Sequence, residues 1–91
     1  MSKWRHEPRG PGKAERMFVE MDGAHFELLA YTYDAGENRL ASGFEIFARD
    51  TRGRYVDQVA MGEAASLDES KALAEAMVRR PRSQWPVLTL A

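Results

Sequence analysis

The stretch "RMFVEMDGAHFELLAYTY", residues 16–33, decides the fold. Asp22-Gly23 at its centre is typical of a two-residue hairpin turn, because both central positions of that turn need positive φ and these residue types tolerate it. The turn also sets the register of the flanking strands, in which Glu20 faces His25. The stretch therefore predicts an antiparallel hairpin.

The two faces of this hairpin differ in character, because successive side chains of a strand point to opposite sides of the sheet. One face is apolar and is expected to be the core face: Met17, Val19, Met21, Phe26, Leu28 and Ala30. The opposite face, here named the outer face, is mixed: Arg16, Phe18, Glu20, His25, Glu27, Leu29, Tyr31 and Tyr33.

A second hairpin follows the loop "DAGENR" at 34–39, in the stretch "LASGFEIFARDTRGRYVDQVAM" at 40–61. Asp50 and Gly53 suit the first and last positions of a type I turn. The register that this turn predicts places three pairs on the core face: Ala48 with Val56, Ile46 with Gln58, and Phe44 with Ala60. It places the alternate residues on the outer face: Phe47, Arg49, Tyr55, Asp57 and Val59.

A helix is predicted after the second hairpin. Ser66 and Glu69 in "SLDE" form a capping box, in which the serine hydroxyl accepts from the amide of the third helical residue. An apolar stripe recurs at helical spacing through Leu67, Ser70, Leu73, Ala74, Met77 and Val78. Pro81 stops the helix. The fold class is therefore α+β, an antiparallel meander of four strands, with a fifth as an alternative, packed by one C-terminal helix.

The chain divides into one folded domain with two basic ends. Residues 1–15 are expected to be a flexible basic arm because Pro and Gly cluster there, 16–80 to be the sheet and helix, and 81–91 to be a tail that could add an edge strand. Residues 1–16 carry five basic and two acidic side chains, and 79–91 carry three arginines and no acid. The segment 17–78 carries five basic and twelve acidic side chains, which is not the usual charge pattern of a nucleic-acid-binding domain.

Several functions are disfavoured by composition. The chain has no Cys and only two histidines, His6 and His25, and its serines lie in no nucleophile motif, so we expect a protein that is not an enzyme and needs no cofactor. Glu20, His25 and Glu27 share a face and offer a weak metal site, but a cross-strand charge pair is the commoner reading, so no metal is expected. No apolar run is long enough to span a membrane, and the N-terminus does not resemble a signal peptide, so the expected location is the cytoplasm.

Aromatic and arginine side chains on the outer face are the best candidates for a binding site: Phe18, Tyr31, Tyr33, Phe47, Arg49 and Tyr55. We interpret the chain as a small non-catalytic interaction module that binds a protein partner or a second copy of itself, as a homodimer. The alternative is a nucleic-acid-binding accessory protein that stacks bases on these rings and uses its basic ends. A weaker third reading is an enzyme or ligand-binding subunit whose site a partner completes.

The order of four strands and a helix over 17–80 resembles small sheet-plus-helix DNA-binding modules, such as the arm-binding domain of phage-type integrases and the plant AP2 domain. The strands lack the base-reading arginine and tryptophan pattern of those modules, so no residue role is carried over.

Overall fold

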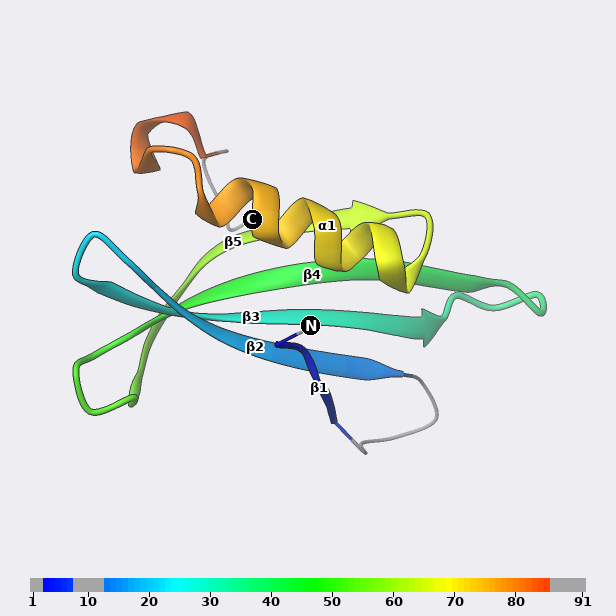
Figure 1. The fold of residues 1–91 in the computed structure, drawn as a ribbon. Coiled ribbons are helices and arrows are strands. Elements are labelled where there is room, and N and C mark those ends of the chain that lie inside the picture. Colours follow the sequence, from blue (N-terminus) through cyan, green and yellow to red (C-terminus); the bar gives the residue numbers. More distant parts are fainter. Residues whose placement is uncertain (1–2, 8–12, 86–91) are drawn as a thin grey trace.

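The computed structural model describes residues 3–7 and 13–85. Within these ranges the chain forms five strands, one α-helix and a short 3-10 turn. Their bounds are β1 Arg5–Glu7, β2 Ala14–Met21, β3 Ala24–Asp34, β4 Leu40–Arg49, β5 Tyr55–Ala64, α1 Leu67–Val78 and η1 Arg82–Gln84. The strands form one antiparallel sheet in the order β1-β2-β3-β4-β5, and α1 lies across one face (Figure 1). The α+β fold class is confirmed.

The β2–β3 hairpin has the register predicted from its turn. Glu20 pairs with His25, and the pairing continues without interruption from Met21–Ala24 to Ala14–Tyr31. Asp22 and Gly23 have φ angles of 53° and 81°, the left-handed conformation that the turn requires. The register therefore places alternate side chains of both strands on the faces expected.

The β4–β5 register differs from the prediction. The observed pairs include Ile46 with Ala60 and Phe47 with Gln58, and the register shifts twice near the turn. At each shift β5 has one extra residue, a β-bulge. Each bulge changes the face of the sheet on which the residues beyond it lie, relative to a register without bulges. Gln58, predicted on the core face, therefore donates from Nε2 to Oε1 of outer-face Glu45 at 2.8 Å, whereas Val59 packs against the core.

Part of the segment 1–15, which was expected to be a flexible arm, lies in strands; residues 1–2 and 8–12 fall outside the described residues. Arg5–Glu7 forms β1, which pairs with β2, and β2 begins at Ala14. Trp4 holds this segment against the domain. Its ring packs against the hydrophobic core, and its Nε1 donates to Oε1 of Glu75 on α1 at 3.1 Å. The fifth strand thus lies at the N-terminal edge of the sheet. The alternative edge strand in the tail falls in 86–91, outside the described residues.

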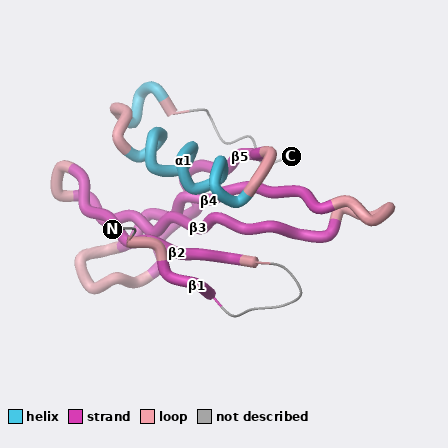
Figure 2. Tube along the Cα trace, turned by 45° about the vertical axis from the view of Figure 1, so that its right-hand side comes forward, coloured by secondary structure: helices cyan, strands magenta, loops and turns pink. Residues whose placement is uncertain are grey.

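The core lies between α1 and the inner face of the sheet, as two views of the layers show (Figures 1 and 2). Its buried members are Met17, Phe26, Leu28, Phe44, Ile46, Ala60, Ala74, Val78 and Trp85. The hydroxyl of Ser66 accepts from the Glu69 amide at 3.1 Å, so the predicted cap is confirmed. Trp85 closes one end of the core, with its ring centroid 5.4 Å from that of Phe26.

Candidate functional site

The outer face of the sheet is the surface that α1 leaves open, and no other described element covers it. The large apolar side chains of the inner face are buried, whereas several of those on the outer face keep much of their area in contact with water. Phe18 is 62% exposed, Tyr55 56%, Met61 48% and Tyr33 42%. Large apolar groups gathered on one face commonly mark an interaction surface.

The structure places all six predicted binding residues on strands of this face, but in two groups. Phe47, Arg49 and Tyr55 meet near the Asp50–Arg54 turn: the two ring centroids are 5.8 Å apart, and the guanidinium carbon of Arg49 lies 5.3 Å from the Tyr55 centroid. Phe18 pairs with Glu27 on β3, and Glu27 pairs with Phe47 on β4, so Phe18 and Phe47 lie at the same position along the strands. We name this part of the outer face the Phe18 end.

Tyr31 and Tyr33 form the second group, at the opposite end of the strands, with centroids 5.9 Å apart. Tyr31 lies across Gly43, where an added Cβ would come within 2.9 Å of both the tyrosine hydroxyl and a backbone oxygen. Glycine at 43 is therefore what lets the ring lie flat on the sheet. We name this part, together with Met61 and Glu63, the Tyr31 end.

A buried carboxylate anchors the Phe18 end, and sequence reasoning missed it. The Glu27 side chain is only 5% exposed, and it accepts from Arg16 on β2 and from Arg49 on β4, the latter at 2.8 Å. Two arginines around one carboxylate leave a local charge of +1. Nε of Arg49 is buried and has no hydrogen-bond partner among the described residues. The signal in the sequence was the diagonal spacing of both arginines from Glu27 across neighbouring strands.

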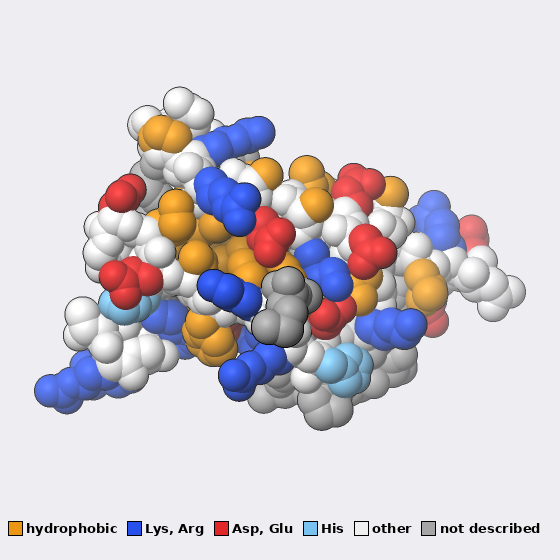
Figure 3. Space-filling view, viewed as in Figure 1, with side chains coloured by type: hydrophobic (Ala, Val, Ile, Leu, Met, Phe, Trp, Pro, Cys, Tyr) orange, Lys and Arg blue, Asp and Glu red, His pale blue; other side chains and the backbone are white. Residues whose placement is uncertain are grey.

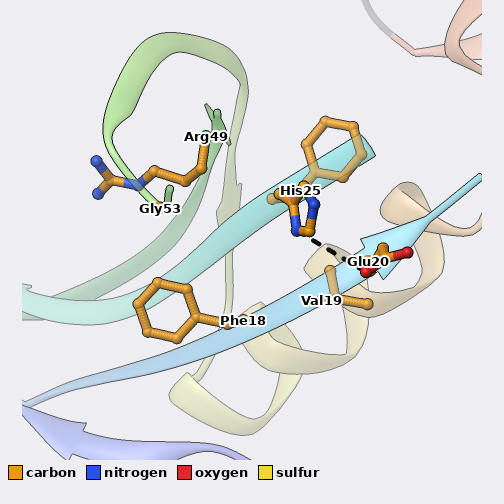
Figure 4. Close-up of a pocket in the computed structure, with 7 residues that line it drawn as sticks. Phe18, Val19, Glu20, His25, Arg49 and Gly53 are labelled. Carbon is orange, nitrogen blue, oxygen red and sulfur yellow. Dashed lines mark ion pairs between the residues drawn. The ribbon is translucent and has the colours of Figure 1, made fainter. Parts of the chain in front are cut away.

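Two hollows flank Phe18. The first, of about 260 Å³, is lined mainly by Phe18, Glu20, His25, Arg49 and Gly53. Figure 4 shows these residues on three neighbouring strands and on the turn after β4, with the His25 side chain directed towards Glu20. The second hollow, of about 460 Å³, is lined by Phe18 and four residues of the β1–β2 edge: Lys3, Trp4, Arg5 and Arg16. An exposed ring between cationic groups can bind an acidic, partly apolar partner.

Two carboxylates act on Tyr31. Burial raises the pKa of Tyr31, and the carboxylates of Glu45 and Glu63 raise it further because they disfavour the tyrosinate anion. Neither carboxylate makes an ion pair within residues 3–7 and 13–85. A hollow of about 490 Å³ lies here, lined by residues that include Tyr31, Gly43, Met61 and Glu63.

The weak metal site considered from the sequence is not assembled. Nδ1 of His25 lies 4.0 Å from Oε2 of Glu20, whereas the Glu27 carboxylate accepts hydrogen bonds from two arginines. The part of the chain that the structure describes contains no group of three side chains able to hold a metal ion. Nor does it contain a helix long and apolar enough to cross a membrane.

The view of the molecule in Figure 3 shows basic and acidic side chains interspersed, without a continuous basic surface. A scan of protein-family models and searches of curated proteins and of solved structures found no match to this chain. The geometry of the outer face is therefore what bears on function.

Proposed function

We propose that this chain is a small non-catalytic binding module that uses the outer face of its sheet to bind a protein. The observation that carries the proposal is the contrast between the two faces. The inner face is covered by α1, whereas the outer face presents Phe18 and Tyr55 to solvent beside a buried cluster of two arginines and a carboxylate. Aromatic and arginine side chains are the residue types enriched in the centres of protein interfaces.

The order of the Phe18 end supports this proposal. The guanidinium of Arg49 is held by Glu27 and lies against Phe47 and Tyr55, so little side-chain entropy remains to be lost when a partner binds. Preorganised rings and arginines therefore provide contact area at a low entropic cost. The two hollows beside Phe18 give a partner side chain a place to insert.

Single-strand nucleic-acid binding is the second candidate. It is favoured by one observation, the hollow that Lys3, Arg5 and Arg16 line together with the rings of Trp4 and Phe18. Cations beside rings suit phosphates and stacked bases. The carboxylates elsewhere on this face would repel a strand that runs along the sheet, so we rank a protein partner first.

Photo-crosslinking in the native cells tests the proposal. A photoreactive amino acid replaces Met61 on the outer face or, as a matched control, Leu73 on α1; the two native side chains are 48% and 38% exposed. We expect protein adducts from position 61 in clear excess over position 73. Equal yields from the two positions would contradict the proposal, and adducts with RNA or DNA would favour the second candidate.

A further inference from the structure

Building on the proposed function, we infer that the protein partner presents an acidic peptide segment to the β1–β2 edge of the sheet, with an apolar side chain close to the acid. The site is the hollow of about 460 Å³ at this edge, here named the edge hollow. Its five lining side chains are three cations and two rings: Lys3, Arg5, Arg16, Trp4 and Phe18. Because β1 is the outermost strand, the hollow can be reached from the side of the sheet (Figure 1).

Two arginines face one another directly in this hollow. Arg5 on β1 pairs with Arg16 on β2, and the Cβ atoms of directly opposed residues lie about 4.5–5.5 Å apart. Like charges in such a pair destabilise the sheet. An oxyanion between the two guanidinium groups reverses this effect, because it attracts both and accepts hydrogen bonds from both. The pair is therefore unfavourable in the free chain and favourable when an acid is bound.

Lys3 and Arg5 have no counter-charge of their own. Both side chains are exposed, and neither makes an ion pair with any side chain that the structure describes. The pairing that starts at Arg5 and Arg16 continues through Leu29 to Glu45 on β4. Glu45 is three strands from Arg5, about 14 Å at the usual strand spacing, which is too far for direct contact. A carboxylate from a partner therefore supplies the charge that Arg5 lacks.

Arg16 is held in place before a partner arrives. Its Nη1 donates to Oε2 of buried Glu27, and Oε1 of the same carboxylate accepts from Arg49 at 2.8 Å. One side of the facing arginine pair is thus fixed by the sheet. Less side-chain entropy is then lost when an acid binds, so more of the electrostatic attraction remains as affinity.

Phe18 supplies the apolar part of the site. It follows Arg16 by two residues on β2, so both side chains lie on the same face, and its own side chain is 62% exposed. Exposed ion pairs alone contribute little affinity, whereas an apolar side chain that covers this ring adds contact area. A nucleic-acid strand would carry further phosphates beyond the hollow, towards Glu20 on β2. A peptide with a single acid avoids that repulsion, so we choose the peptide.

Fluorescence polarisation of labelled peptides on the full chain tests the inference. The probe has eight residues, with glutamate and phenylalanine in turn at the odd positions and threonine at the even ones, so an extended peptide presents both on one face. Its neutral match has glutamine for glutamate. We expect the glutamate peptide to bind about tenfold more tightly at low salt, and the difference to shrink as salt screens the charges. Equal affinities, or tighter binding of an eight-nucleotide thymidine oligomer, would overturn the inference.

Substitutions separate the edge hollow from general charge effects. Arg5→Gln should weaken the glutamate peptide about tenfold. Arg80→Gln, the matched control, removes the same charge from an exposed side chain just beyond the C-terminal end of α1 and should leave the affinity unchanged. Phe18→Ala should weaken both peptides alike, because both carry phenylalanine. Equal effects of the two arginine variants would overturn the inference.

The stability of the free chain gives a second measurement. Because Arg5→Gln removes a repulsion, its urea midpoint should equal or exceed that of the native chain, and a lower midpoint would mean that Arg5 supports the fold instead. The two proposals can also fail separately. If the glutamate peptide does not bind but position 61 crosslinks to protein in excess over position 73, the binding module stands and the acidic segment is excluded.

Discussion

Replacing Glu27 with Gln tests whether the buried cluster orders the outer face. The substitution keeps the shape and one acceptor oxygen but removes the negative charge that holds two arginines. The side chain of Glu27 is 5% exposed, and those of Arg16 and Arg49 are 24% and 17% exposed. Breaking a fully buried ion pair costs about 3–5 kcal/mol because the remaining charge is left uncompensated. Both guanidinium groups keep some access to water, so we expect a loss of about 2–3 kcal/mol.

The assay is urea unfolding followed by the fluorescence of both tryptophans, half-buried Trp4 and buried Trp85, with the free energy of unfolding extrapolated to water. Glu45→Gln is the matched control on the same face. Glu45 is half-buried and accepts a hydrogen bond from Gln58 at 2.8 Å, which an amide oxygen can still accept. We expect the control to cost less than about 1 kcal/mol. Equal losses for the two variants would refute the reasoning, since the arginines would then be solvated well enough without Glu27.

Three further predictions concern the core, the helix start and one tyrosine. Leu28→Ala removes a side chain with no exposed area and should lower the free energy of unfolding by about 2–5 kcal/mol, whereas Leu73→Ala should cost under about 1 kcal/mol; equal urea midpoints would mean that the core is misplaced. Ser66→Ala leaves an amide at the start of α1 without its acceptor and should cost about 1 kcal/mol; an unchanged thermal midpoint would show that the cap does not matter. Tyr31 has a raised pKa when folded, so its contribution to stability should be lost as the pH rises through that pKa, and Glu45→Gln should bring the pKa down; an unchanged tyrosinate absorbance titration would contradict this.

The first hairpin could be predicted fully because local chemistry determines it. Asp22-Gly23 selects a two-residue turn, and that turn leaves one register for the strands on either side. The cap at Ser66 is equally local, since donor and acceptor lie three residues apart. Predictions of this kind need no knowledge of the rest of the fold.

The second hairpin and the N-terminal strand depended on distant contacts. Nothing in 55–64 marks where an extra residue enters β5, so the position of Gln58 was wrong. Trp4 is ordered by Glu75, 71 residues further along the chain, and composition alone suggested a free arm. The six candidate binding residues were assigned to the outer face from alternation. Their separation into two groups, and the buried carboxylate of Glu27 beside one of them, required the register across neighbouring strands.

Photo-crosslinking from two matched positions tests most directly whether the outer face, and not the face that carries α1, binds a protein. Met61 lies on the outer face and Leu73 lies on α1, and the two native side chains are 48% and 38% exposed. The account predicts protein adducts from a photoreactive amino acid at position 61 in clear excess over the same amino acid at position 73. Equal yields from the two positions, or adducts from position 73 alone, would contradict it.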